Sequence, residues 1–398
     1  MKVINNAYVR QLKSRRGKPW QGVVKWCDGS MQKTMTRLFD RNDIRTKTQA
    51  QLALSSWVQE LEDDMAAEDR VPVVSEYVDA YINQLVESQQ IEPSTARGYR
   101  SSAALIYKAF RDVRIDDLAP AQIQEWEARI IAGGKSASTV GRAHRLLKQV
   151  LKHAVNTGDL TSNPMVMVKP PKRRKPSPNS LDHAGRVKVL AMLDGMELTP
   201  VVMAAYIALY TGMRQGEICA LMWKDVNLAN AEINVRRSIG NGEGGCYVKT
   251  PKTSSSQRTI PMPSQLVTCL ERRLDSMLKE MPYKNSVYNT YVCGTADGKY
   301  LNPTVLGRSW ATMARNAGLV GTQGRRCTFH DLRHTYATMT IAGGADVKSV
   351  ASILGHANAA MTLNVYASAD TDAMRRTAEI VERAMGEEMP RNGKHFAE

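Results

Sequence analysis

The amino-acid sequence predicts a multidomain protein with three folded parts: a small N-terminal module of three strands and a helix, an all-helical domain, and a mainly helical C-terminal domain with a small antiparallel sheet. Turn dipeptides separate short β-branched and aromatic runs near the N-terminus, and apolar residues recur every three or four positions through the middle of the chain. A proline-rich basic stretch then separates this region from a C-terminal half of mixed pattern. At 398 residues the chain is long enough for several cores of ordinary size.

The N-terminal part, residues 1–65, is predicted to form a sheet followed by a helix. Runs rich in β-branched and aromatic residues alternate with the turn dipeptides Arg16-Gly17 and Asp28-Gly29, a pattern typical of β-hairpins. The strand candidates are 7–12, 21–27 and 32–39. Residues 48–65 then place apolar side chains at helical spacing. Because basic residues predominate here, the module either contacts DNA or presents a solvated basic face.

Residues 71–165 are predicted to form an all-helical domain. The helix candidates are 73–86, 93–110, 119–131 and 136–155. Two of these helices also repeat basic residues at intervals that place them on one face, and such a stripe either follows DNA phosphates or is simply solvated. The candidate DNA contacts from these helices are Arg97, Arg100, Arg142, Arg145 and Lys148.

Residues 166–180 mark a domain boundary. Prolines interrupt regular structure there, and five basic residues fall between Lys169 and Lys175. We predict a basic linker that leads into a C-terminal domain of residues 181–398. The linker either reaches around DNA or carries its charge incidentally. The candidate DNA contacts from this linker are Lys172, Arg173 and Arg174.

The overall composition favours a polyanionic partner. The formal net charge is +15 and the isoelectric point is near 9.5, which is typical of proteins that bind nucleic acid. The six cysteines include no C-x-x-C pair, so a zinc finger or disulfide framework is unsupported and the thiols are expected to be reduced. The longest apolar run is well short of the roughly 20 residues that span a bilayer, and no apolar signal segment opens the chain. We therefore expect a cytoplasmic protein with no membrane partner.

The first half of the C-terminal domain is predicted to hold a buried helix and one small sheet. Thr199-Pro200 is a helix start and Thr211-Gly212 a helix end, and the next helix begins with Arg214 in its first turn and Glu217 one turn on. The helix dipole disfavours an arginine there, so either Glu217 pairs with it or an anion binds it. The sheet strands are predicted at 231–239, 247–250 and 258–262, with the glycine-rich segment 240–245 as a hairpin loop.

The stretch "FHDLRHTYAT" concentrates ionisable side chains at the start of a predicted helix. Thr328 and Asp331 form a capping pattern, and Gly343-Gly344 ends the helix. His330 and His334 are four residues apart and could bind a metal, whereas His330 and Arg333, three apart, could both face an anion. The H-E-x-x-H pattern of zinc proteases is not matched, because aspartate replaces the glutamate and a cationic arginine lies beside it. The anion interpretation is therefore favoured.

A set of residues in order along the C-terminal half resembles the tyrosine recombinase family of phage-type integrases. The matching motifs are Arg214 in "TGMRQGEICALMW", Lys252 in "TPKTSSSQRTIP", His330 and Arg333 in "HDLRHTYAT", His356 in "LGHAN" and Tyr366 in "TLNVYA". Residues 71–165 resemble that family's core-binding domain and residues 1–65 the arm-type DNA-binding domain of its heterobivalent integrases. The resemblance makes residues 181–398 the catalytic domain and extends over nearly the whole chain.

The resemblance implies a role for each of these residues in the attack on a DNA phosphodiester. Arg214 and Arg333 would clamp the phosphate oxygens in a bidentate geometry that lysine cannot reproduce. Tyr366 would be the nucleophile, and because the ordinary pKa of tyrosine is about 10, it needs help to lose its proton. The family implies His330 as the base and His356 as a support for the phosphate.

The departing 5′ oxygen also needs a proton, and the resemblance implies a lysine on a hairpin turn as the general acid. Lys252 matches the family's pattern, with Lys249 close enough in sequence to remain an alternative. A covalent phosphotyrosine keeps the energy of the broken ester, so a free 5′ hydroxyl can reverse the step. We therefore expect no metal, nucleotide or other cofactor.

The function predicted on this basis is that of a site-specific DNA recombinase, an integrase that cuts and rejoins strands through a 3′-phosphotyrosine and integrates and excises a mobile element or prophage. The expected partners are double-stranded DNA attachment sites, a homotetramer assembled on DNA, and DNA-bending and directionality proteins. Two alternatives remain open: a metal-dependent hydrolase that uses His330, His334 and His356, and a non-catalytic DNA-binding regulator.

Overall fold

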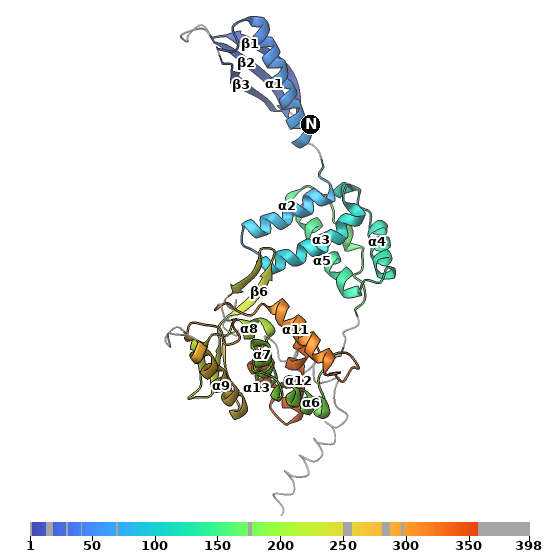
Figure 1. Cartoon of the computed structure of the whole chain (residues 1–398). Coiled ribbons are helices and arrows are strands. Elements are labelled where there is room, and N and C mark those ends of the chain that lie inside the picture. Colours follow the sequence, from blue (N-terminus) through green and yellow to red (C-terminus); the bar gives the residue numbers. More distant parts are fainter. Residues whose placement is uncertain are drawn as a thin grey trace, which may run out of the picture. The chain divides into compact units, whose positions relative to one another are not determined.

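The computed structural model describes residues 2–12, 19–28, 31–40, 42–68, 71–173, 177–249, 257–280, 287–295 and 298–356. The chain divides into two compact units. The first contains residues 1–90 and 99–172, and the second contains residues 91–98 and 173–398 (Figure 1). The domain boundaries predicted from the sequence stay predictions.

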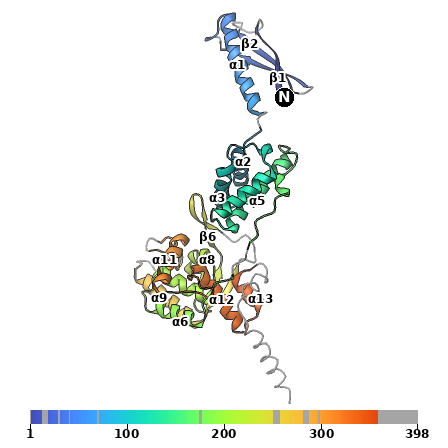
Figure 2. The same ribbon diagram turned by 90° about the vertical axis from the view of Figure 1, so that its right-hand side faces the viewer.

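The N-terminal part of the first unit is a three-stranded antiparallel sheet with one helix packed on it (Figure 2). The elements are β1 (Lys2–Gln11), β2 (Trp20–Asp28), β3 (Met31–Leu38) and α1 (Lys47–Glu68). Val24, Leu54 and Trp57 are buried in its small core. A Cβ at Gly22 would lie 3.2 Å from both Leu54 and Trp57 of α1, so a glycine is what lets the helix approach the central strand. The predicted module of three strands and a helix is confirmed.

Four helices form the other core of the first unit, as predicted. They are α2 (Val74–Glu87), α3 (Pro93–Phe110), α4 (Pro120–Ala132) and α5 (Ala137–Thr157), with the short 3-10 helices η1 (Ile115–Asp117) and η2 (Pro164–Val166). The sequence sets the bounds of α5, because the Ser136 side chain accepts from the Thr139 amide and Gly158 takes a left-handed conformation at the end. Apolar faces of these helices meet in one buried cluster.

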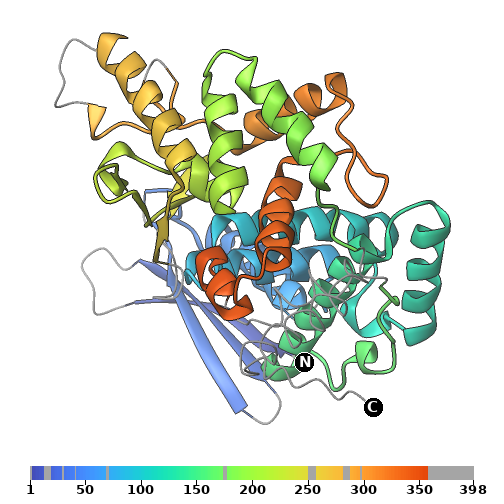
Figure 3. The ribbon, with the colours of Figure 1, turned by 90° about the horizontal axis from the view of Figure 1, so that it is seen from below.

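The second unit is mainly helical and packs around α7. Its helices are α6 (His183–Asp194), α7 (Pro200–Thr211), α8 (Gln215–Cys219), α9 (Ser264–Glu280), α11 (Pro303–Asn316), α12 (Phe329–Ala342) and α13 (Val347–Leu354), with the 3-10 helix η3 (Trp223–Asp225). Residues 202–209 of α7 are buried without interruption, which identifies α7 as a core helix. Figure 3 shows α12 and α13, in orange-red, close to the green α7, and the contacts between α12 and both of these helices are extensive.

Two small sheets occur in the second unit where the sequence predicts one. β4 (Val226–Asn227), β5 (Glu232–Val235) and β8 (Arg258–Pro261) form an antiparallel sheet in the order β4-β5-β8, whereas β6 (Ser238–Gly242) and β7 (Gly245–Lys249) form a separate hairpin. The prediction of one continuous strand over 231–239 in a single three-stranded sheet is therefore wrong: β5 pairs with β8, whereas Ser238 and Ile239 pair with Lys249 and Val248 of β7. The chain leaves β5 at Arg236-Arg237, where Arg237 forms an ion pair with the buried Asp225. The glycine-rich turn of the hairpin is as predicted.

Within the described residues, no helix combines the length and the apolar character that crossing a membrane requires.

Candidate active site

Arg214 is placed by the tight connection between α7 and α8. The Thr199 hydroxyl caps α7, and Gly212 ends it in a left-handed conformation with φ of 62°. A Cβ at Gly212 would lie 2.5 Å from the Tyr336 ring, so only glycine fits this turn against α12. Arg214 is then the N-cap residue of α8, one position before the first turn in which it was predicted.

Glu217 holds Arg214 by both its side chain and its main chain. Arg214 Nη1 donates to Glu217 Oε1 at 2.9 Å, and the Arg214 amide donates to Oε2 at 2.9 Å. The Arg214 side chain nevertheless remains 40% exposed, while that of Glu217 is 7% exposed. The structural pairing therefore leaves one face of the guanidinium open to solvent.

Arg258, the first residue of β8, joins the same carboxylate from the other side. Its Nη1 and Nη2 donate to the two oxygens of Glu217 at 3.2 and 2.8 Å, a bidentate pair. Its Nε donates to the carbonyl of Ile353, and its side chain is only 6% exposed. Sequence reasoning missed this residue. The available signal was an arginine at the start of a short predicted strand.

Arg333 lies on the inner face of α12, and the start of that helix is fixed by its cap. Asp331 accepts from the Thr328 amide and hydroxyl, both at 2.8 Å, as the capping pattern predicted. Arg333 is 4% exposed. Its Nη1 donates to the Gly212 carbonyl at 2.6 Å, and its Nη2 lies 2.7 Å from His356 Nε2. Both arginines predicted as the clamp are therefore held at the turn between α7 and α8: Arg333 binds the carbonyl of Gly212, and Arg214 follows Gly212 by two residues.

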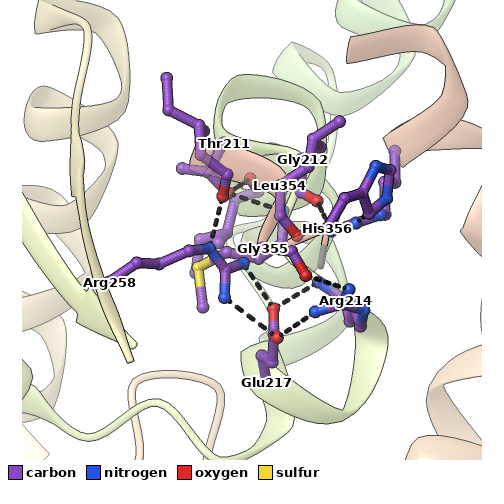
Figure 4. A network of polar contacts seen from close by, with 12 residues as sticks. Thr211, Gly212, Arg214, Glu217, Arg258, Leu354, Gly355 and His356 are labelled. Atoms are coloured by element: carbon purple, nitrogen blue, oxygen red, sulfur yellow. Dashed lines mark hydrogen bonds and ion pairs between the residues drawn. The ribbon is translucent and has the colours of Figure 1, made fainter. Parts of the chain in front are cut away.

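The carboxyl end of α13 gathers all three arginines. Figure 4 shows Arg214 and Arg258 beside Glu217 and Gly355. Three successive main-chain carbonyls each accept from a different guanidinium: that of Ile353 from Arg258, that of Leu354 from Arg333 at 2.8 Å, and that of Gly355 from Arg214 at 2.7 Å. The last carbonyls of a helix have no partner within it and bear partial negative charge, so cations are favoured there.

Gly355 is the residue that allows this approach. It ends α13 in a left-handed conformation with φ of 64°, and a Cβ there would lie 3.0 Å from Arg258 Nη1 and 3.4 Å from Arg214 Nη1. Any larger residue would therefore be strained and would press on two guanidinium groups. The chain continues directly to His356, whose amide donates back to the Ala351 carbonyl at 3.0 Å.

The cluster is cationic, because it contains three arginines and one carboxylate, that of Glu217. Burial opposes ionisation of that carboxyl, but the hydrogen bonds and charge of Arg258, and then of Arg214, outweigh it and hold its pKa below the ordinary value. Burial and the charge of Arg214 lower the pKa of Arg333 to about 9, which still leaves it cationic at neutral pH. The uncompensated positive charge makes this cluster an anion site.

The three histidines near the cluster are neutral at physiological pH. Desolvation lowers the pKa of His330 to about 4 even though part of the residue is exposed, and the neighbouring His334 and Arg333 add to the effect. The pKa of His356 is also lowered to about 4, by desolvation and then by Arg333 and Arg214. Since Arg333 can only donate, His356 Nε2 accepts and its proton is on Nδ1. His330 and His334 contact edge to face, with ring centroids 4.7 Å apart.

A metal site receives no support from the described part of the chain. No group of three or more histidine, cysteine or acidic side chains with the spacing to hold a metal ion occurs there. The Nε2 atom of His356, one of the three histidines of the metal-dependent alternative, accepts from Arg333. The arrangement favours an anion instead.

The structure brings Arg214, Arg333 and His356 together, and His330 lies one helical turn before Arg333 on α12. Lys252, Tyr366 and Arg174 lie outside the described residues. Lys249, the alternative to Lys252, ends β7 and donates to Glu92 of the same structural unit at 3.1 Å.

The predicted DNA contacts on the helices and linker are mostly accessible. The exposed ones are Arg97, Arg142, Arg145, Lys148, Lys172 and Arg173. Arg100 is half-buried and donates to Asn83 at 2.9 Å, so part of its hydrogen-bonding capacity is used inside the protein.

Comparison with known proteins places this geometry in a family. Residues 189–372 match the model of the phage integrase family. A tyrosine recombinase XerC-like protein of Caldanaerobacter subterraneus subsp. tengcongensis is 28% identical over 274 residues, which cover 64% of this chain and 68% of that protein. The transposase of transposon Tn916 from Enterococcus faecalis is 26% identical over 341 residues, 81% of each chain. A putative prophage phiRv2 integrase of Mycobacterium tuberculosis strain H37Rv is 26% identical over 363 residues, 89% of each.

Solved structures share the fold. The Tn1549 transposon integrase in complex with transposon right end DNA superposes with a TM-score of 0.65 at 24% identity, covering 78% of this chain and 99% of that one. A lambda integrase dimer bound to a core site gives a TM-score of 0.58 at 16% identity, covering 86% and 91%. With the cation cluster of α8, α12 and α13, the family match over residues 189–372 and these relatives support a tyrosine recombinase of the integrase type, a site-specific DNA recombinase.

Proposed function

We propose that this recombinase integrates and excises a mobile element by attack of Tyr366 on a DNA phosphodiester, which forms a covalent 3′-phosphotyrosine. The observation that supports this most directly is the convergence of Arg214, Arg333 and His356 on the end of α13 from stretches far apart in the chain. An exposed guanidinium beside a buried one, with excess positive charge, suits a phosphate that gains negative charge as it is attacked. Tyr366 follows His356 by ten residues.

Arg214 and Arg333 are the proposed phosphate clamp, and His330 is the proposed base for the Tyr366 proton. The lowered pKa of His330 keeps its ring neutral and able to accept a proton. A phosphate bound beside it would raise that pKa, because an anion favours the charged imidazolium. His356, which already orients Arg333 through Nε2, would support the phosphate beside Arg333.

Lys252 is the proposed general acid that protonates the departing 5′ oxygen. It lies in the segment between β7 and β8, and β8 begins with the site residue Arg258. Lys249 is less suited, because its ammonium is engaged by Glu92.

A nicked suicide substrate tests the nucleophile. When the short strand beside the cleavage point diffuses away, the covalent protein-DNA adduct accumulates. The wild type should give a DNA-linked band of higher mass, while Tyr366→Phe should bind the same DNA and give no band, because it lacks the attacking oxygen. An adduct formed by Tyr366→Phe would place the nucleophile elsewhere. Sequencing of adducts captured from genomic fragments would supply the attachment site.

The N-terminal module is proposed to bind separate arm sites on attachment DNA, as in a heterobivalent integrase. Side chains alternate across a strand, so the sheet face opposite α1 includes Tyr8, Val23 and Thr36, which are aligned across the three strands. Arg10 belongs to the same face and is exposed. Val23 is buried, but Tyr8, Arg10 and Thr36 are exposed, and such polar and basic side chains suit contacts to DNA.

Two arginines on opposite faces of this sheet provide a matched test. Arg10 lies on the open face, whereas Arg37 lies on the helix side, 3.1 Å from Glu60 and over the Trp57 ring. Deletion of residues 1–62 should abolish footprints outside the core site and spare core-site cleavage. Arg10→Ala should weaken the same footprints, and Arg37→Ala should leave them. If no protected arm sequence exists for the wild type, the module has another role.

The assembly on DNA is proposed to be a homotetramer on two paired sites, assisted by DNA-bending and directionality proteins. Apolar residues recur at helical spacing between 373 and 385, a segment outside the described residues. We propose that this segment docks on a neighbouring protomer. Truncation after Asp372 should spare single-site binding but reduce the complex from a tetramer, as measured by light scattering on DNA. An unchanged tetramer would assign the segment to its own protomer.

A further inference from the structure

Arg258 differs from the two clamp arginines in what it can reach. Its side chain is 6% exposed, compared with 40% for Arg214, and three of its nitrogens donate within the protein: two to Glu217 and one to the Ile353 carbonyl. A group enclosed in this way is poorly placed to touch DNA. Its effect on a bound phosphate has to pass through its protein partners.

The first of these partners is Glu217, whose charge Arg258 shares with Arg214. Oε1 accepts from Arg214 Nη1 at 2.9 Å and from Arg258 Nη1 at 3.2 Å, while Oε2 accepts from Arg258 Nη2 at 2.8 Å and from the Arg214 amide. Without Arg258, the buried carboxylate would have Arg214 as its sole guanidinium partner in this network. Arg214 would then be neutralised by Glu217 and would offer less positive charge to a phosphate.

The second partner is the end of α13. Arg258 holds the Ile353 carbonyl, and Gly355 packs on its guanidinium so closely that a Cβ would lie 3.2 Å from Arg258 Cζ. The next two carbonyls, of Leu354 and Gly355, orient Arg333 and Arg214. A shift of Arg258 would therefore displace the acceptors of both clamp arginines.

We propose that Arg258 is a positioning residue for strand cleavage, which limits how far Glu217 compensates the charge of Arg214 and fixes the α13 end that aligns the clamp. The proposal rests on the function proposed above. The arginines of this site then have two roles: Arg214 and Arg333 hold the phosphate, and Arg258 positions Arg214 and Arg333. Its removal should thus weaken recognition of phosphate charge without touching the nucleophile.

The test compares two nicked suicide substrates built on the trapped attachment site, one with the natural phosphodiester and one with a neutral methylphosphonate at the cleavage point. A methylphosphonate lacks one anionic oxygen and needs the clamp less. Arg258→Lys keeps the charge but loses the bidentate pair, and it should form the adduct on the order of 10²-fold more slowly on the phosphodiester, the typical cost of misplacing a reacting group by about 1 Å. The wild-type rate divided by the Arg258→Lys rate should be at least about tenfold smaller on the methylphosphonate than on the phosphodiester. The same decrease is expected for Arg214→Lys.

Arg237→Lys is the matched control. Arg237 also pairs with a buried carboxylate in the same unit, that of Asp225, but among the described residues it forms no hydrogen bond or ion pair with the cluster on α13. A role in folding alone lowers the amount of active protein, so Arg237→Lys should give equal ratios on both substrates. Equal ratios for Arg258→Lys, or a wild-type rate on the phosphodiester, would overturn the proposal.

A double variant covers the case in which Arg258→Lys is too unstable to assay. Arg258→Met with Glu217→Gln removes both buried charges together, which avoids an unpaired carboxylate. If Arg258 positions the clamp, the double variant should again lose less activity on the methylphosphonate than on the phosphodiester. An equal loss on both substrates would reject the proposal. A wild type that forms no Tyr366 adduct would instead refute the proposed function.

Discussion

Replacing Arg333 by lysine should reduce both stability and cleavage, and the structure separates the two effects. The guanidinium spans from the Gly212 carbonyl to the Leu354 carbonyl, at 2.6 and 2.8 Å, in a buried position. A single ammonium cannot serve both acceptors, so at least one charge-assisted hydrogen bond is lost and a buried carbonyl is left without its partner. That loss corresponds to about 2 kcal/mol of unfolding free energy. Cleavage should fall on the order of 10²-fold or more, since one donor to the developing charge is worth roughly 3 kcal/mol.

Arg214→Lys is the comparison that isolates the catalytic part. Arg214 is 40% exposed, and Glu217 keeps Arg258 as a partner when Arg214 changes. Its replacement should cost under about 1 kcal/mol of unfolding free energy, because exposed ion pairs contribute little, yet cleavage should fall as far as for Arg333→Lys. Urea unfolding of the free protein and single-turnover adduct formation measure the two quantities. Equal stability losses for the two variants, or no stability loss for Arg333→Lys, would refute this account.

Three further predictions concern the turn and the histidines. Gly355→Ala should lose about 1–2 kcal/mol of unfolding free energy and cleave more slowly, whereas Gly324→Ala, with φ of 65° and no neighbour within 4 Å of the new Cβ, should lose stability through backbone strain but retain cleavage per folded molecule. The pKa of His330 is lowered to about 4, so the stability that this neutral ring contributes is present above the unfolded pKa near 6.5 and is lost as pH falls toward 4. The melting temperature should therefore decline less steeply between pH 7 and 5 for His330→Gln than for the wild type. His334→Ala should slow cleavage much less than His330→Ala, with EDTA changing neither; comparable losses together with inhibition by EDTA would return the metal-dependent alternative.

Local signals predicted the elements that position the site. Thr199, Gly212 and Gly355 mark helix ends by chemistry that acts over a few residues, and each has its expected role in the structure. The spacing of His330 and Arg333 likewise placed both near the start of α12. Such signals are reliable here because capping and left-handed glycines depend on neighbouring residues rather than on distant packing.

Long-range pairing was less accessible to sequence reasoning. The partners of Arg258 are Glu217, 41 positions away, and Ile353, 95 positions away. A lone arginine at the start of a strand gives no indication of either partner. The separation into a β4-β5-β8 sheet and a β6-β7 hairpin likewise depends on which strand pairs with β5. The alternation of apolar and polar residues does not specify that partner. The arginine contacts on α13 are made to main-chain carbonyls, which every residue type possesses, so no side-chain pattern in α13 could announce them.

The order of the three arginines and their carbonyl acceptors along the chain has a consequence for incompletely synthesised protein. Arg214, Arg258 and Arg333 all precede the carbonyls of Ile353, Leu354 and Gly355 along the chain, so a ribosome completes the three cations before their shared acceptors exist. A nascent or prematurely terminated chain would hold mutually repelling guanidinium groups around one carboxylate. Such a fragment would be basic but would lack the carbonyls that align Arg214 and Arg333 in the complete fold.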